Sequence, residues 1–313
     1  MEKTMKKFFL LLAAAIFTFT IGQSAMAENL VIKHNQGETA IPAKVERLVI
    51  MDYGPLDTID ALMTQGLISQ DLAIAMPKAN MPAYLAKYMD DKYVDLGTLK
   101  DFNLETVASF KPDLIIISLR QQDFYKQLSG IAPTIVINNI PNPYWEGVTQ
   151  NIRDLGNIFG TQDAVEQALA RLDTRAEQIA AAARAKNVKA LILLTNDGKI
   201  SAYGSGSRFG IIHDKLGVGQ ADDKIKVGIH GQLVNYEYIA GMNPDYIFVI
   251  DRSVAVGMKA NDVRMLQNEL IDGTNAAKNG RIIALDPQIW YLSGGGLESL
   301  DIMMDEVETA LQK

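Results

Sequence analysis

The chain has 313 residues, of which 48% are hydrophobic and 21% are charged, and it contains no cysteine. This composition excludes a disordered protein and, through the missing thiols, excludes disulfides, thiolate metal sites, cysteine nucleophiles and a lipid-modified cysteine. The net charge of −7 argues against nucleic acid as a partner, because nucleic acid selects clustered lysine and arginine. The length suggests two domains.

The first 27 residues have the pattern of a secretory signal peptide. Lys3, Lys6 and Lys7 precede an apolar run over residues 8–21, and a small-residue cleavage pattern ends at Ala27. The alternative is a membrane anchor, although a spanning helix needs about 20 apolar residues and this run is shorter. Cleavage after Ala27 would leave 27 basic and 36 acidic residues, a net charge of −9. We therefore expect a free periplasmic protein without a lipid anchor.

Nearly continuous apolar runs alternate with helical patterns along the rest of the chain. Such runs are typical of parallel strands that are covered on both faces, so the alternation predicts an α/β fold with mainly parallel sheets. We expect strands at residues 47–51, 114–117, 134–137, 188–194, 246–250 and 281–285, and helices at residues 56–63, 145–159 and 297–311.

Residues 162–186 differ from these short segments, because they run for 25 residues without glycine or proline. Thr161 is the predicted N-cap, and acidic residues early and basic residues late match the helix dipole. The apolar positions recur at spacings of three and four, at Val165, Leu169, Leu172, Ala176, Ile179 and Ala183. We interpret this helix as the connection between two lobes, and the alternative is a long crossover helix inside one domain.

The predicted organisation has four parts. They are a signal peptide over residues 1–27, an N-terminal α/β lobe over 28–160, a linker helix over 161–187 and a C-terminal α/β lobe over 188–313.

An internal repeat supports two similar lobes. Residues 103–120 and 235–252 align without a gap at an offset of 132, with seven of 18 positions identical. Each copy predicts a short helix, a Pro-Asp break and a buried strand, followed by Arg120 or Arg252. Ligands of open parallel sheets gather beyond the carboxyl ends of the strands, so the two arginines could form a two-sided clamp. The alternative is that each is a solvated loop arginine.

Three further features could carry chemistry. The glycine-rich segment 204–210 could offer backbone donors and Arg208 to an anion at a helix N-terminus, or it is a plain turn. His230 and Tyr291 lie in glycine-containing loops, where they could complete the coordination of iron presented by a ligand. Alternatively, His230 is solvated and Tyr291 packs. His213 is predicted to lie on the surface, and the common hydrolase, zinc-protease and Walker motifs are absent.

The chain from residue 28 onward resembles the periplasmic binding proteins of ABC importers for ferric siderophores and vitamin B12, and more closely the branch that binds ferric catecholates. The resemblance implies two Rossmann-like α/β lobes with mainly parallel sheets, joined by one long α-helix, with the ligand cleft between the lobes. It rests on the repeat, the central helix, the loop at residues 203–210, the His230-Gly231 pair and the segments at residues 244–252 and 285–292.

The resemblance also implies roles for individual residues. Arg120, Arg208 and Arg252 would face the anionic ferric complex. His230 and Tyr291 would bind Fe(III) when the siderophore leaves two coordination sites open. The repeat glutamates, Glu105 and Glu237, would dock onto the permease from one lobe each, and the alternative is that they are ordinary exposed helix residues.

By the same resemblance, the protein is expected not to be an enzyme and to have no intrinsic cofactor. It would carry ferric catecholate siderophores, enterobactin-like ligands and linear tetradentate forms included, to an inner-membrane ABC permease with its ATPase. We expect a monomer that binds no nucleic acid. A haem or vitamin B12 binding protein is the alternative within this transporter class, and an exported α/β hydrolase is a remote one.

Overall fold

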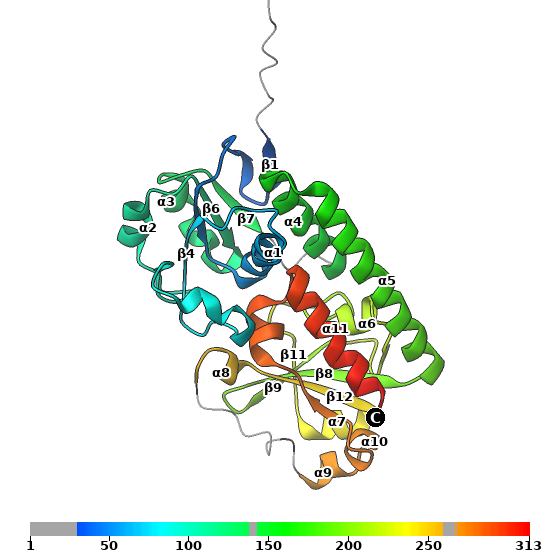
Figure 1. Ribbon diagram of the computed structural model, residues 1–313. Helices are drawn as coiled ribbons and strands as arrows, with labels where there is room; N and C mark the ends of the chain where they lie inside the picture. The colour runs from blue at the N-terminus through cyan, green and yellow to red at the C-terminus, as the bar shows by residue number, and fades with distance from the viewer. Residues whose placement is uncertain (1–29, 138–142, 259–265, 267) are drawn as a thin grey trace, which may run out of the picture.

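The computed structural model describes residues 30–137, 143–258, 266 and 268–313. Within them the chain forms two α/β lobes, and α5 (Gln162–Lys186) runs alongside both (Figure 1). The predicted signal peptide, residues 1–27, lies outside the described residues. Over the described ranges, no helix combines the length and the apolar character needed to cross a membrane.

The N-terminal lobe is built on a five-stranded sheet in which every pair of neighbours is parallel, in the order β5-β4-β3-β6-β7. A two-stranded antiparallel hairpin precedes it. The strands are β1 (Val31–His34), β2 (Gly37–Ala40), β3 (Arg47–Ile50), β4 (Ala73–Met76), β5 (Val94–Asp95), β6 (Leu114–Ser118) and β7 (Thr134–Ile137). The helices are α1 (Tyr53–Thr64), α2 (Leu104–Phe110), α3 (Tyr125–Ser129) and α4 (Tyr144–Phe159), with 3-10 turns η1 (Ala83–Met89) and η2 (Leu119–Phe124).

The C-terminal lobe has a mixed sheet in the order β11-β9-β8-β12-β13, with β10 also paired to β8. Strands β10, β12 and β13 are parallel to their neighbours, whereas β9 and β11 are antiparallel. The strands are β8 (Lys189–Asn196), β9 (Lys199–Tyr203), β10 (Gly219–Gln220), β11 (Gln232–Val234), β12 (Tyr246–Asp251) and β13 (Ile282–Ala284). The helices are α6 (Ile211–Asp214), α7 (Tyr236–Met242), α8 (Arg252–Ala255), α9 (Glu269–Asp272), α10 (Asn275–Lys278), the π-helix η4 (Ile289–Ser293) and α11 (Leu297–Leu311).

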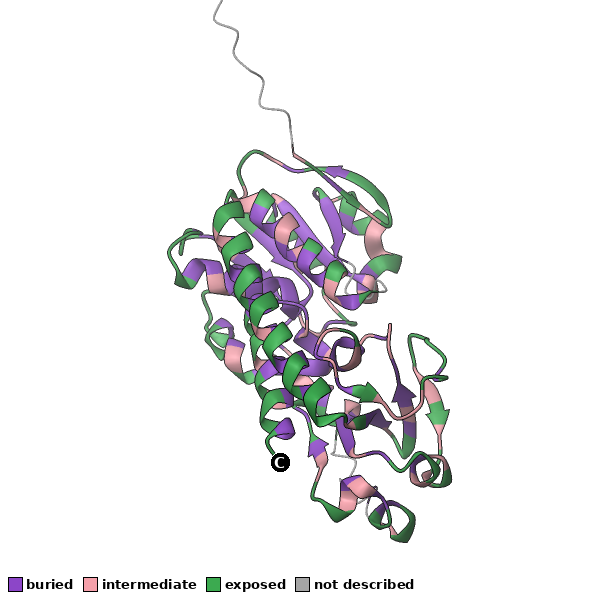
Figure 2. Cartoon of the chain, turned by 90° about the vertical axis from the view of Figure 1, so that its right-hand side faces the viewer, coloured by how far each residue is buried: buried purple, intermediate pink, exposed green. Residues whose placement is uncertain are grey.

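The six strands predicted from apolar runs are present, with ends that shift by one or two residues. The reason that they are apolar throughout is visible in β6, where Ile116 packs into one core cluster and Ile115 and Ile117 pack into another. Successive side chains of a strand point to opposite faces, so a strand with helices on both faces buries every residue. The buried strands accordingly lie inside each lobe (Figure 2).

The long helix predicted over residues 162–186 is present as α5, and the six apolar residues predicted to line its inner face are all buried. The opposite face of α5 is exposed along its length (Figure 2). The predicted N-cap was wrong, however. The Thr161 side chain makes no capping bond, and its hydroxyl is buried without a partner among the described residues. The backbone there is bent out of the extended conformation that a capping side chain usually requires.

The two lobes are also joined where α1 of the first lobe meets the start of α11 of the second. The buried Asp57 of α1 accepts hydrogen bonds of 2.7 Å from the backbone N–H groups of Glu298 and Ser299. These two donors have no partner inside α11, so Asp57 caps a helix 240 residues away in sequence. A side chain at Gly296 would collide with the backbone of Gly54, which explains the glycine at this contact. This junction fixes the position of one lobe against the other.

Candidate functional site

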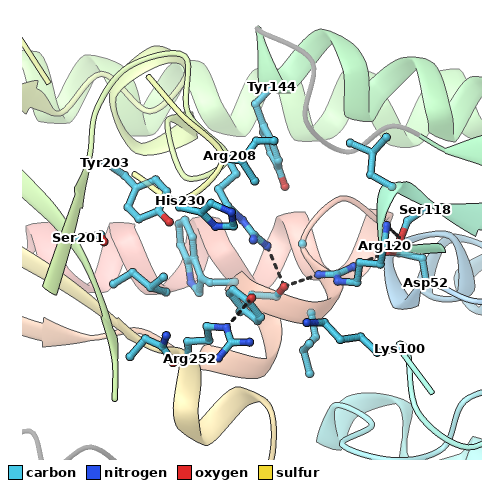
Figure 3. A pocket seen from close by; sticks show the side chains of 18 of the residues that line it. Asp52, Lys100, Ser118, Arg120, Tyr144, Ser201, Tyr203, Arg208, His230 and Arg252 are labelled. Carbon is cyan, nitrogen blue, oxygen red and sulfur yellow. Dashed lines mark hydrogen bonds and ion pairs between the residues drawn. The ribbon is translucent and has the colours of Figure 1, made fainter. Parts of the chain in front are cut away.

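A cavity of about 570 Å³ lies between the two lobes and is lined by side chains from both. Figure 3 shows that Arg120 reaches it from the first lobe, whereas Arg208 and Arg252 reach it from the second. All five predicted ligand-binding and iron-binding residues therefore converge on one space, because His230 and Tyr291 line the same cavity as the three arginines. The cavity is the place that the repeat predicted, beyond the carboxyl ends of β6 and β12.

The repeat explains how Arg120 and Arg252 arrive there. Asn103 and Asn235 are the N-caps of α2 and α7, and their side chains accept backbone hydrogen bonds of 3.0 and 2.9 Å. Lys111 and Asn243 then end the two helices in the left-handed conformation, with φ of 51° and 42°. The helix in each copy thus begins and ends by the same local devices.

The Pro-Asp break joins each helix to its strand. Asp113 accepts hydrogen bonds of 2.8 Å from the backbone of Glu46 and Arg47 at the start of β3. Asp245 accepts one of 2.9 Å from Lys189 at the start of β8. Each aspartate ties its strand to the neighbouring parallel strand, so the arginine that follows the strand is delivered to the same edge of the sheet in both lobes.

Arg120 is held by groups from both lobes. Its Nη1 donates to Oδ2 of the buried Asp52 at 2.8 Å, and its Nη2 donates to the backbone carbonyl of Tyr291 at 2.8 Å. Asp52 follows β3, which is the direct neighbour of β6, so the two partners come together at adjacent strand ends. Arg120 is therefore fixed in direction without any ligand.

Arg208 and Arg252 surround Tyr291 from the second lobe. Arg208 donates to the Tyr291 carbonyl at 2.9 Å, and its guanidinium lies 4.5 Å from the centre of the Tyr291 ring. Burial and then the positive charge of Arg120 lower the pKa of Arg208. Arg252 donates to the Tyr291 hydroxyl at 2.8 Å and to Oδ1 of Asn196 at 2.9 Å. The three cations thus hold the backbone carbonyl and the hydroxyl of a single tyrosine.

Tyr291 lies in η4, the π-helix that follows β13, and its ring is half-buried. Burial acts to raise the pKa of its phenol, but the hydrogen bond from Arg252 and the charges of Arg208, Arg252 and Arg120 outweigh burial, and the pKa falls below its usual value. A lowered pKa makes the phenolate more accessible near neutral pH. Phenolate is a hard oxygen ligand of the kind that ferric iron prefers.

His230 lines the cavity from an exposed loop before β11. The loop turns at Gly231, whose φ of 67° is left-handed, and a side chain there would collide with the ring of Tyr203. Ile229 and Leu233, which are 64% and 69% exposed, also line the cavity beside it. His230 is thus placed at the mouth of the cavity rather than packed in the core. Across the described ranges, no cluster of three or more His, Cys, Asp and Glu could hold a metal ion.

The glycine-rich segment does not form the predicted anion cradle. Its backbone N–H at Gly206 donates to Asp214 at 2.8 Å, and Ser205 donates to the same carboxylate. The helix that follows, α6, has only four residues. The donors of Ser205 and Gly206 are therefore already used within the chain, and from residues 204–210 only Arg208 lines the cavity. The prediction for His213 was also wrong, because that ring is half-buried and Nδ1 lies 2.8 Å from the Val218 carbonyl.

Glu105 and Glu237 occupy equivalent positions in the first turns of α2 and α7, and both side chains are exposed. No ion pair to either of them is found in the part of the chain that the structure describes. An acidic residue in a first helical turn also interacts favourably with the helix dipole. The placement is compatible with docking and with this purely local role.

Several residues of the cavity were missed by the sequence reasoning. They are Asp52, Lys100, Tyr144, Asn196, Lys199, Ser201, Tyr203 and Trp290. A signal existed for part of this set, because the Asp197-Gly198 turn, with φ of 47° and 76°, is the usual two-residue connection of a β-hairpin. That turn predicts β9 antiparallel to β8, and β9 carries Lys199, Ser201 and Tyr203 to the cavity.

The chain belongs to the periplasmic binding protein family, whose model matches residues 48–289. It is therefore a substrate-binding protein and not an enzyme. It is 42% identical to the petrobactin-binding protein YclQ of Bacillus subtilis over 99% of this chain and 100% of that protein. It is 32% identical to the ferric-anguibactin-binding protein FatB of Vibrio anguillarum over 89% of this chain and 86% of that protein.

Solved structures agree with the fold. The crystal structure of YclQ from Bacillus subtilis superposes with a TM-score of 0.87 at 43% identity, covering 91% of this chain and 99% of that one. The periplasmic catecholate-siderophore binding protein VctP from Vibrio cholerae gives a TM-score of 0.80 at 32% identity, covering 90% and 100%. The predicted fold class, two α/β lobes with mainly parallel sheets and one long connecting helix, is confirmed.

Proposed function

We propose that this protein captures ferric siderophores, specifically ferric catecholates of the enterobactin-like and linear tetradentate kinds, and delivers them to an inner-membrane ABC permease and its ATPase. The observation that carries the proposal is the convergence of Arg120, Arg208 and Arg252 on Tyr291 inside one interlobe cavity. The names of the relatives support it, since YclQ, FatB and VctP are each described as binding a siderophore or its ferric complex.

The charge of such a ligand suits this cavity. Three catecholates around Fe(III) carry a net charge of −3, and guanidinium groups donate strong hydrogen bonds to anionic oxygens. Arginine also stacks on electron-rich rings, as Arg208 already does on Tyr291. The protein has an overall negative charge, so an anion site has to be assembled from local cations.

We further propose that Tyr291 and His230 bind Fe(III) directly when the siderophore supplies only four oxygens. Octahedral iron then lacks two ligands, and one phenolate and one imidazole can fill these positions. The lowered pKa of Tyr291 supports this role, because binding through oxygen releases the phenol proton. The protein needs no cofactor of its own in this scheme, since the iron arrives with the siderophore.

The first test is a fluorescence titration of the purified protein. Trp290 lines the cavity, so an iron-catecholate chromophore bound there should quench its emission. We expect saturable quenching at micromolar or lower concentrations of ferric bis- and tris-catecholates. Haem and cobalamin are the matched controls, and tight binding of either one with no response to ferric catecholates would replace our proposal by transport of that ligand.

We also propose that Glu105 and Glu237 dock the loaded protein onto the permease from one lobe each. Both lie on the exterior of their lobes, in the first turns of α2 and α7. Replacing both with alanine should leave the Kd for ferric catecholate unchanged and strongly reduce uptake in cells. The matched control is Asp163→Ala together with Glu269→Ala, which removes two other exposed carboxylates from first helical turns. Equal loss of uptake in both double variants would mean that net charge, and not docking, matters.

Export and assembly complete the proposal. We propose a cleaved signal peptide over residues 1–27, lobes over 28–160 and 188–313 and a linker helix over 161–187. We also propose that the mature chain is a free monomeric periplasmic protein. The sequence contains no cysteine to which a lipid could be attached. Mass measurement and sedimentation of the exported protein would test the cleavage site and the monomer.

A further inference from the structure

The cavity contains a buried carboxylate that faces the same space as the cations. Among the described residues that line the cavity, Asp52 is the only acidic one. Its side chain has no exposed surface, and its Oδ2 accepts the 2.8 Å hydrogen bond from Arg120. A carboxylate inside an anion-binding site repels an anionic ligand and lowers its affinity. The presence of Asp52 therefore needs another explanation.

Helix capping does not account for the charge. Asp52 is the N-cap of α1, and its Oδ1 accepts from the backbone N–H of Gly54 at 3.1 Å. Asparagine and serine cap helices about as well as aspartate, so capping requires an oxygen but no negative charge. The negative charge acts on the neighbouring cation, which is Arg120.

The second lobe shows the contrasting arrangement. Arg252, the repeat partner of Arg120, donates to the amide oxygen of Asn196 and to the hydroxyl of Tyr291, and neither of these partners is a carboxylate. The strand beside the arginine thus supplies an acid in the first lobe and an amide in the second. Arg252 keeps its full charge toward the cavity, whereas Arg120 and Asp52 form a pair with no net charge.

We propose that Asp52 is a specificity-determining residue that tunes the cleft to ferric catecholates of low net charge. The proposal rests on the proposed function. A ferric bis-catecholate carries −1, and a Tyr291 phenolate bound to its iron brings the total to −2, whereas a ferric tris-catecholate carries −3. The exposed lysines Lys100 and Lys199 also line the cavity, but the buried carboxylate repels every unit of ligand charge and so disfavours the −3 complex more. Asp52 therefore neutralises the charge of Arg120 and weakens binding of the more highly charged complex.

The test compares two probes on one variant. The probes are the 1:1 ferric complex of a linear bis(catecholamide) and the ferric complex of a tris(catecholamide), and the readout is the ratio of their Kd values from Trp fluorescence at fixed ionic strength. Asp52→Asn should shift this ratio by about tenfold in favour of the tris-catecholate, because the removed charge acts on −3 in the tris-catecholate complex and on −2 in the bis-catecholate complex with its phenolate. Added salt should reduce the shift. A structural defect would weaken both probes alike and leave the ratio unchanged.

The matched control is Asp113→Asn, which removes one carboxylate of the same lobe at the opposite, amino-terminal edge of the sheet. It should leave the ratio within about twofold of the wild type, since solvent and salt screen a charge at the far edge of the sheet. A shift as large as that of Asp52→Asn would show that overall charge is responsible and would overturn the proposal. An unchanged ratio in a folded Asp52→Asn protein would overturn it too. Failure of the wild type to bind either probe would instead refute the proposed function.

A second variant keeps the test decisive if Asp52→Asn does not fold. Arg120→Gln leaves the carboxylate without its cation and should weaken the tris-catecholate more than the bis-catecholate. Adding Asp52→Asn to Arg120→Gln removes both buried charges, and this is often neutral for stability. The double variant should bind the tris-catecholate about tenfold more tightly than Arg120→Gln alone. No recovery in the double variant would mean that Asp52 only caps α1.

Discussion

The two copies of the repeat build the same strand end but surround its arginine differently. In both lobes an asparagine caps the helix, a residue with positive φ ends it and an aspartate ties the strand to its neighbour. Beyond the strand the copies diverge. Arg120 is paired with the carboxylate of Asp52, whereas Arg252 is paired with the amide of Asn196 and the phenol of Tyr291.

The comparison separates what the repeat preserves for folding from what it leaves free for binding. The shared Asn and Asp satisfy backbone groups that would otherwise lack partners, so they are needed wherever this helix-to-strand connection occurs. The partners of the arginines come from other strands, β3 in one lobe and β8 in the other. These partners can differ without disturbing the connection, and they decide how much positive charge each lobe presents to the cleft.

The largest expected effect concerns the two arginines and the charge that each one contributes. Arg252→Gln removes a full cation that bonds the Tyr291 phenol, and we expect the Kd of a ferric bis-catecholate to rise about a hundredfold, near the upper range for a hydrogen bond to a charged group. The combined Arg120→Gln and Asp52→Asn variant removes a pair with no net charge and should raise the Kd less than about tenfold. Fluorescence titration of both proteins measures the difference.

Thermal unfolding of the same proteins is the control, because both should remain folded at the titration temperature. Equal increases in Kd for Arg252→Gln and for the combined Arg120→Gln and Asp52→Asn variant would show that the two lobes do not differ in the charge they present to the cleft. In that case, Arg120 would contribute a full charge to the ligand despite its contact with Asp52.

An intermediate effect is expected at Tyr291, where the two lobes meet. Tyr291→Phe keeps the backbone carbonyl that accepts from Arg120 and Arg208 and loses only the hydroxyl. We expect about a tenfold rise in Kd for a bis-catecholate, a much smaller change for a tris-catecholate, and loss of the phenolate-to-iron charge-transfer band. Visible absorption spectra of the complexes, recorded with the titrations, provide both measurements.

Tyr203→Phe is the matched control, because Tyr203 lines the same cavity while burial raises its pKa to about 12. Its loss should leave the charge-transfer band intact. If the phenolate-to-iron charge-transfer band survives in Tyr291→Phe, then Tyr291 only packs against the arginines.

The pH dependence of bis-catecholate binding tests how the arginines act on Tyr291. Arg252 lowers the pKa of Tyr291, so the phenolate should persist to lower pH in the wild type than in Arg252→Gln. Affinity falls as pH falls because the proton competes with iron for the phenolate. In Arg252→Gln the pKa of Tyr291 rises, and the fall in affinity should therefore begin at a higher pH. Identical pH profiles for the two proteins would contradict a role for the phenolate.

Sequence reasoning predicted the parts of this molecule that follow from local patterns. The apolar runs gave β6 and β12, the helical spacing gave α5, and the repeat register placed Arg120 and Arg252 at strand ends facing one cavity. All of these depend on residues close together in the chain, where side-chain periodicity reports the faces that are buried.

The missed parts depend on contacts between distant residues. Asp52 directly follows a predicted strand, and nothing local in the sequence reveals that its Oδ2 meets Arg120, 68 residues away. The glycine-rich segment left an anion site and a plain turn both open, because the carboxylate that takes its donors belongs to Asp214 in the next helix. Thr161 fits the composition of an N-cap, but its backbone, with φ of −115° and ψ of 28°, lies outside the extended conformation that a capping side chain usually requires.

The smallest expected effect tests the shared half of the comparison. Asn103→Ala and Asn235→Ala each remove a capping hydrogen bond at equivalent places, and each should lower the free energy of unfolding by about 1 kcal/mol. Asn103→Asp and Asn235→Asp keep an accepting oxygen and should cost much less. Chemical denaturation measures all four, and the Kd for ferric catecholate should stay constant because neither asparagine lines the cavity as described. Similar losses in the two lobes would mean that the repeated asparagine serves folding. If only one lobe loses stability, the asparagine in the other lobe is present for a reason other than folding.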